Sequence, residues 1–118
     1  MKYILVLQWP GISESDYDEL IAMEDRLEAD LPFAHGFVDG HDFGSGEMNI
    51  FIHTDQPLDA FRDATVVLSG DPRWADVRAA YRPTEGNYFV LVWPETLLEF
   101  SVSRNTLSRI AVRPGQLR

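Results

Sequence analysis

Cysteine is missing from this chain of 118 residues, and basic residues are few. Without a thiol the chain can form no disulfide, no thiol nucleophile and no thiolate metal site, which agrees with a reducing compartment. Ten Lys and Arg residues against 19 Asp and Glu residues give a formal net charge of −9. Nucleic-acid binding needs a basic surface, so we expect none.

Long apolar runs and cofactor motifs are also missing. The opening run from Ile4 to Leu7 ends at Gln8, so it is too short for a signal sequence or a membrane span. We therefore expect a cytoplasmic protein that does not enter a membrane. No metal-ligand spacing, nucleophile motif or phosphate-binding loop stands out, so we expect no metal and no cofactor. The 45% apolar and 25% charged residues are typical of a globular domain.

Acidic residues are concentrated in the first half of the chain. Residues 1–63 hold 14 acids and three bases, a net charge of −11, whereas residues 64–118 have a net charge of +2. Eight carboxylates lie within residues 14–30, and four of them share one side of the helix expected there: Glu14, Asp18, Asp25 and Glu28. Such a side is either a solvated helix face or a docking surface for a basic protein partner.

The pattern of apolar residues and turn signals predicts alternating strands and helices. We expect strands over residues 3–9, 33–43, 47–54, 77–82 and 88–93, and helices from Ser13 or Ser15 to Pro32 and from about Pro57 to Gly70. Beyond Pro94, alternation of apolar and polar residues over 98–103 favours an edge strand, although Thr96 and Glu99 also form a helix capping box.

This order of strand, helix, strand, strand, helix and strand resembles the ferredoxin-like βαββαβ fold over residues 1–94. The resemblance implies an α+β protein with an antiparallel sheet, two helices on one face, the first and third strands in the centre and room for an extra hairpin strand. It carries no functional motif. We expect residues 1–94 to form the domain and residues 95–118 to form a C-terminal extension that packs on it or on a partner subunit.

The predicted strands carry apolar side chains on both sides, but two helices can cover only one face of a sheet. Five large apolar side chains left in water would forgo roughly 7–15 kcal/mol, which is comparable with the stability of a domain. Another copy of the chain, the segment 97–112 or an apolar ligand should therefore cover the second face. Pairing of two such faces resembles the dimeric α+β barrels, which include cofactor-independent oxygenases and stress-related proteins; the resemblance implies a homodimer.

All three histidines lie between residues 35 and 53. A three-residue loop at residues 44–46 would place His35, His53 and Asp55 within reach of one another, as acid–base chemistry or a divalent metal would need. A two-residue turn would instead separate His35 from His53. Ordinary surface or hydrogen-bonded histidines are the alternative.

Two functional hypotheses follow. The first is a small binding protein without catalysis, docking a basic protein through its acidic helix. The second is a cofactor-independent enzyme or small-molecule binder with a pocket on the second sheet face, in which His35, His53 and Asp55 are the polar groups and three aromatic residues are the walls, Trp9, Phe51 and Trp93. High salt would weaken the first kind of binding and leave the second nearly unchanged.

Overall fold

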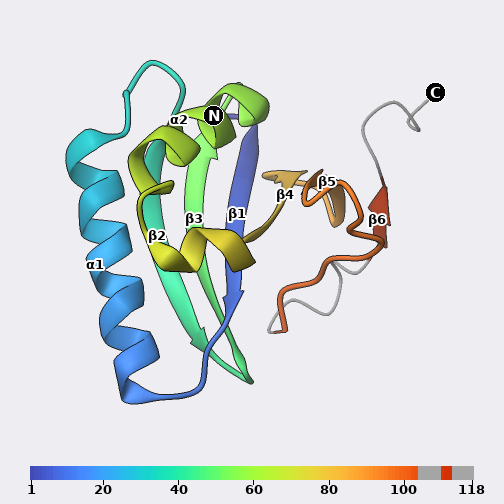
Figure 1. Ribbon diagram of the computed structural model, residues 1–118. Helices are drawn as coiled ribbons and strands as arrows, with labels where there is room; N and C mark the ends of the chain where they lie inside the picture. The colour runs from blue at the N-terminus through green and yellow to red at the C-terminus, as the bar shows by residue number, and fades with distance from the viewer. Residues whose placement is uncertain (104–109, 113–118) are drawn as a thin grey trace.

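The computed structural model describes residues 1–103 and 110–112 of the chain. The elements follow one another as β1 (Tyr3–Pro10), α1 (Glu14–Asp30), β2 (Phe37–Gly44), β3 (Glu47–Thr54), α2 (Pro57–Leu68), a short 3-10 helix (Pro72–Asp76), β4 (Arg78–Pro83), β5 (Tyr88–Trp93) and β6 (Ile110–Val112). Figure 1 shows the two long helices on one side of the sheet and residues around 100 on the other side. No helix in the described residues is long and apolar enough to cross a membrane.

The ends of the two helices follow from local sequence. Ser13 caps α1: its side chain accepts the backbone N–H of Asp16, and the Asp16 side chain accepts the backbone N–H of Ser13 in return. The helix ends before Pro32, which cannot continue it. Pro57 occupies the first turn of α2, where a missing N–H costs nothing, and Gln56 precedes it without a side-chain cap.

The sheet has six strands in the order β2-β3-β1-β4-β5-β6. Neighbouring strands are antiparallel from β2 to β5, and β6 runs parallel to β5. The structure therefore supports an α+β protein with two helices and five antiparallel strands. Its strand number and order differ from those of the four-stranded ferredoxin-like fold that the sequence resembles, because β5, which the sequence predicts over residues 88–93, and β6 extend the sheet beyond β4.

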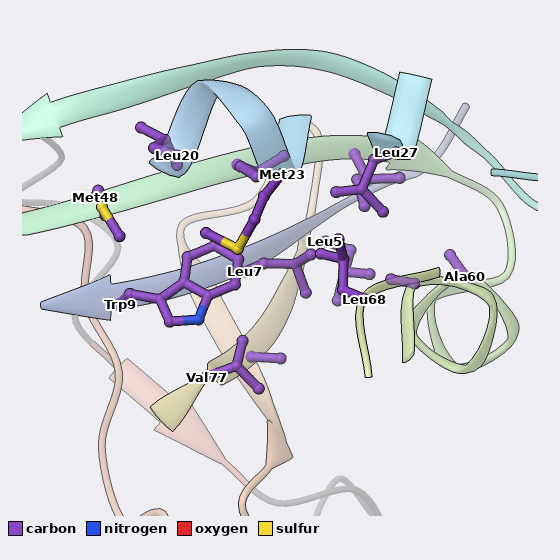
Figure 2. Packing of buried hydrophobic residues seen from close by; sticks show 14 residues of the cluster. Leu5, Leu7, Trp9, Leu20, Met23, Leu27, Met48, Ala60, Leu68 and Val77 are labelled. Atoms are coloured by element: carbon purple, nitrogen blue, oxygen red, sulfur yellow. The ribbon is translucent and has the colours of Figure 1, made fainter. Parts of the chain in front are cut away.

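One face of the sheet, here called the helix face, packs against α1 and α2. Residues of β1 at alternate positions, Leu5, Leu7 and Trp9, point into this core and are buried. Figure 2 shows these three side chains beside Met23 and Leu68 from the two helices. The other buried members of the core come from both helices, β3, β4 and the residue before β4: Leu20, Leu27, Met48, Ile50, Ile52, Ala60, Ala64, Val77 and Ala79.

The opposite face, here called the second face, is covered in part by residues 97–103, the covering segment. Phe100 and Val102 from this segment are buried against Val6 of β1 and Phe89 of β5. The rings of Phe89 and Phe100 meet edge to face at 4.9 Å. The rest of this smaller cluster is Ala80 and Leu91, with Ile4, Phe51 and Leu97 packed around it.

Two expectations from the sequence are wrong: the strand expected over residues 98–103 and the start of the strand expected at Phe33. The covering segment is neither strand nor helix. Its alternation of buried and exposed side chains is real, but it serves packing on the sheet face instead of pairing at the sheet edge. Strand β2 begins at Phe37 and not at Phe33, because a turn occupies residues 33–35. The proposed division of the chain at residue 94 stays a prediction.

Candidate functional site on the second sheet face

The structure gives each of the three predicted catalytic residues a different partner. The Nδ1 atom of His35 lies 2.5 Å from Asp63 Oδ2 on α2. The Nε2 atom of His53 lies 3.4 Å from Asp39 Oδ2. The side chain of Asp55 accepts a hydrogen bond from the backbone N–H of Lys2 at 2.8 Å. The three residues therefore do not converge on one point.

The turn between β2 and β3 explains this separation. Its loop has two residues, Ser45 and Gly46, with φ angles of 58° and 82°, and Gly44 lies opposite Glu47. Positive φ at both loop residues is the conformation whose twist matches a two-residue hairpin. The three-residue loop considered from the sequence is not formed.

A bulge farther along β2 changes the pairing between β2 and β3. The pairing register shifts between Val38 and Gly40, so that Phe37 lies opposite His53. The two rings stack with centroids 5.5 Å apart. The neighbour of His53 is therefore an aromatic ring and not His35. Among the described residues, no group of three or more His, Cys, Asp or Glu side chains could hold a metal ion.

The three aromatic residues expected to line one pocket lie in different places. Trp9 is buried on the helix face, where its Nε1 donates a hydrogen bond to the carbonyl of Arg73. Trp93 is 42% exposed and lies 6.4 Å from the ring of Phe61 on α2. Only Phe51 lies on the second face, where it borders a cavity.

The four acids proposed for partner binding, Glu14, Asp18, Asp25 and Glu28, are exposed on α1 and make no ion pair or hydrogen bond within the described residues. Other acids of the helix are engaged. Asp16 and Glu19 both bind Arg73, and Glu24 contacts His41 at 2.9 Å. The free carboxylates thus gather on the outer side of the helix.

Arg73 and Asp16 connect the start of α1 to the 3-10 helix. Backbone N–H groups of Ser13 and Ile12, followed by the Arg73 guanidinium, hold the pKa of Asp16 well below its usual value. Hydrogen bonding to Glu19 raises the pKa of Arg73. These shifts stabilise charged forms at the helix end and lie outside the cavities of the second face.

Polar side chains cross the second face at one end of the sheet, a feature that sequence analysis missed. Strand pairing places Asp42, Asn49, Gln8 and Arg78 opposite one another on β2, β3, β1 and β4. Gln8 is 1% exposed and Asn49 is 0% exposed. The sequence does contain a signal for these two residues. Gln8 interrupts the apolar strand β1 two residues after Val6, and Asn49 interrupts β3 two residues before Phe51, in each case on the same face.

Glu47 is the centre of the hydrogen-bond network that joins this row to the covering segment. Its Oε2 accepts from Gln8 Nε2 at 3.1 Å, from Asn49 Nδ2 at 3.1 Å and from the backbone N–H of Ser103 at 3.2 Å. Its Oε1 accepts from the Ser103 hydroxyl at 2.5 Å. Gln8 Nε2 also lies 2.9 Å from the carbonyl oxygen of Ser101. The network ties residues 101–103 to β1 and β3.

A cavity of about 550 Å³ lies beside this network. Its lining comes from the sheet, through Gln8, Glu47 and Arg78, and from residues 99–103 of the covering segment. A second cavity of about 280 Å³ adjoins the first at Val102, and its wall is more apolar because Val6, Phe51 and Phe89 contribute to it.

The side chains that line the large cavity include several hydrogen-bonding and charged groups. Its described lining contains no histidine, cysteine or lysine. The Glu47 carboxylate already accepts four hydrogen bonds, so it is fixed in place. The hydroxyl of Ser103 is engaged by Glu47. Hydrogen bonding and ion pairing are the interactions that this arrangement offers to a ligand.

Comparison with protein-family models, with curated proteins and with solved structures gives no significant match to this chain.

Proposed function

We propose that the protein binds a small polar molecule in the large cavity of the second sheet face, as in the second sequence hypothesis but without the histidines. The observation that carries this proposal is the network of the buried Gln8 and Asn49 with the half-buried Glu47, which holds the covering segment beside a cavity of about 550 Å³. Ligand cavities in proteins commonly have volumes of about 300–1,000 Å³.

The energetics of this end of the sheet support the proposal. Burying an amide without a hydrogen bond costs about 1–3 kcal/mol, and apolar side chains would fill the same place without that risk. Here three polar side chains hydrogen-bond to one another on the strands β1 and β3, whose helix face is wholly apolar at the neighbouring positions. Polar side chains that line an open cavity favour the binding of a polar ligand, whereas apolar side chains would pack there at lower cost.

Side-chain amide signals in an NMR titration test the proposal directly. We expect a compound from a library of small polar molecules to shift the NH₂ signals of Gln8 and Asn49 and the backbone signals of residues 101–103. Signals from the exposed side of α1 at Asp18 and Asp25 serve as the internal control and should stay in place. Compounds that shift only residues outside the cavity, or a library without any binder, would contradict the proposal.

A second candidate function is docking of a basic protein on the acidic side of α1. The observation in its favour is that Glu14, Asp18, Asp25 and Glu28 are exposed and unpaired within the described residues, whereas Asp16, Glu19 and Glu24 have partners. Carboxylates without an intramolecular partner keep their full charge for a basic surface.

A peptide rich in lysine and arginine is the probe for this second function. Its affinity should fall steeply between low and high salt, and the variant Asp18→Asn with Asp25→Asn should bind it more weakly. Asp76→Asn, which changes an exposed acid outside α1, is the control. Equal binding by the α1 variant and the control would exclude the helix as the docking surface.

We also propose that β1 to β4 with α1 and α2 are a ferredoxin-like unit that β5 and β6 extend. The chain order β1-α1-β2-β3-α2-β4 and the interior positions of β1 and β3 support this assignment. The homodimer stays a proposal as well. Sedimentation of the protein as a dimer would support it, and sedimentation as a monomer at high concentration would contradict it.

A further inference from the structure

We infer that the ligand of the large cavity is a small zwitterion, a molecule with one carboxylate and one protonated amine such as an amino acid. This inference rests on the proposed function and specifies the ligand class. It depends on three groups of the cavity wall that have no partner among the described residues: the guanidinium of Arg78, the carboxylate of Glu99 and the side-chain oxygen of Gln8.

Arg78 is the carboxylate-binding group. It is half-buried on β4 directly opposite Gln8, and it makes no ion pair or hydrogen bond within the described part of the chain. Two other arginines near the sheet have intramolecular partners. Arg73 binds Asp16 and Glu19. Arg82 donates hydrogen bonds to the carbonyl groups of residues 83, 84 and 86. A free guanidinium in a cavity wall binds a carboxylate through two parallel hydrogen bonds.

Glu99 and Gln8 are the amine-binding groups. Glu99 lines the cavity from the covering segment, is exposed, and has no partner within residues 1–103 or 110–112. The side-chain nitrogen of Gln8 faces three acceptors, Glu47, Asn49 and Ser101. Its side-chain oxygen accepts nothing from the described residues. An ammonium group can donate to both oxygen atoms, and a buried acceptor without a donor is costly.

The balance of charge favours a zwitterion over a simple ion. The described part of the cavity wall holds two carboxylates, Glu47 and Glu99, and one guanidinium, that of Arg78. A simple anion would bind Arg78 but face two negative groups, and a simple cation would face the unpaired Arg78. A molecule that carries both charges satisfies every free group. Phe100 and Val102 add apolar surface to the same wall, so an amino acid with an apolar side chain fits best.

Calorimetric titration with three compounds of similar shape tests the ligand class. Leucine carries both charges, 4-methylpentanoate carries only the carboxylate, and 3-methylbutylamine carries only the amine. We expect leucine, or another apolar member of the twenty amino acids tested alongside it, to bind at least about tenfold more tightly than either single-charge compound, since a hydrogen bond to a charged group contributes about 1.5–3 kcal/mol.

Five variants locate the binding groups. Arg78→Gln should weaken the zwitterion about tenfold to a hundredfold, and Glu99→Gln about twofold to fivefold because Glu99 is exposed. Arg62→Gln on α2 and Glu95→Gln, four residues before Glu99, remove the same charges outside the cavity and should bind like the wild type. Arg78→Lys keeps the charge but loses the paired hydrogen bonds, so we expect an intermediate loss in a folded protein.

The outcomes separate this inference from the proposed function. Equal binding of 4-methylpentanoate and leucine, or unchanged binding in Arg78→Gln, would overturn the zwitterion and leave the cavity as a binding site for another ligand. If no amino acid binds but compounds of the NMR library still shift the signals of Gln8 and Asn49, the zwitterion is likewise overturned and the cavity stays a binding site for another ligand. Absence of binders in both experiments would overturn the inference and the proposed function together.

Discussion

The two faces of the sheet are built from alternate residues of the same strands, yet they are filled differently. Leu5, Leu7 and Trp9 of β1 enter a continuous apolar core under two helices, whereas Val6 and Gln8 between them meet a short segment of extended chain. The described residues at the centre of the helix face form no buried network of polar side chains. The second face combines a small apolar cluster with the polar row that ends at Arg78.

This comparison separates stability from binding. A closely packed apolar core contributes most of the free energy of folding and leaves no space for a ligand. Among the described residues, the seven residues of the covering segment cover part of the second face where the other face has two helices, and cavities of about 550 and 280 Å³ lie beside them. The proposed binding site therefore lies in the part of the molecule that packs less closely.

Leu7→Ala should produce the largest loss of stability and tests the role of the helix face. Leu7 is 0% exposed in the core, and truncating a buried leucine costs about 2–5 kcal/mol. Urea unfolding followed by circular dichroism measures the change. Leu58→Ala, at a position 49% exposed, is the control and should change stability by less than about 0.5 kcal/mol. A similar loss in both variants would remove the distinction between core and surface.

Glu47→Ala should have a smaller effect and tests how the covering segment is held. The variant leaves the side-chain nitrogen atoms of Gln8 and Asn49 and the backbone N–H of Ser103 without this acceptor, so we expect a loss of about 1–3 kcal/mol. Hydrogen exchange should also become faster in residues 101–103. Glu85→Ala, in an exposed loop, is the matched control. Unchanged exchange in these residues would mean that apolar contacts alone hold the segment.

Asp16→Asn should have the smallest effect, and its effect should depend on pH. The pKa of Asp16 is lowered in the folded protein, first by the backbone N–H of Ser13, so its charged form stabilises the fold above the ordinary carboxyl pKa and this contribution is lost as the pH falls. The wild type should therefore exceed the variant in melting temperature at pH 7 and approach it in acid. Asp18→Asn, at an exposed acid without a partner, should show no such trend. A difference that persists in acid would exclude charge as its source.

Local sequence was enough to predict most elements. The expected strand at residues 47–54 agrees with β3, and the expected helices agree with α1 and α2 within a few residues. These elements have long periodic patterns and strong end signals such as Ser13 and Pro32. By contrast, the pairing of β2 with β3 depends on the backbone angles of Ser45 and Gly46 and on one bulged residue. No local preference makes a serine at positive φ the expected choice.

The candidate site was harder to predict than the fold because its residues are far apart in the chain. The sequence located the histidines together, but the structure gives His35 and His53 separate partners on α2 and β2. The residues that line the cavity come from β1, β3, β4 and the covering segment. Glu47 and Ser103 are 56 positions apart, and no spacing rule connects them.

The sequence by itself determined which side chains share a face, since alternation along a strand fixes this and the hydrophobic effect directs the more apolar side toward the helices. The tertiary structure alone decided what covers the other face and which polar groups meet there. That decision depends on strand order, a two-residue turn and the path of the chain after Pro94, all of which are set by contacts between distant residues.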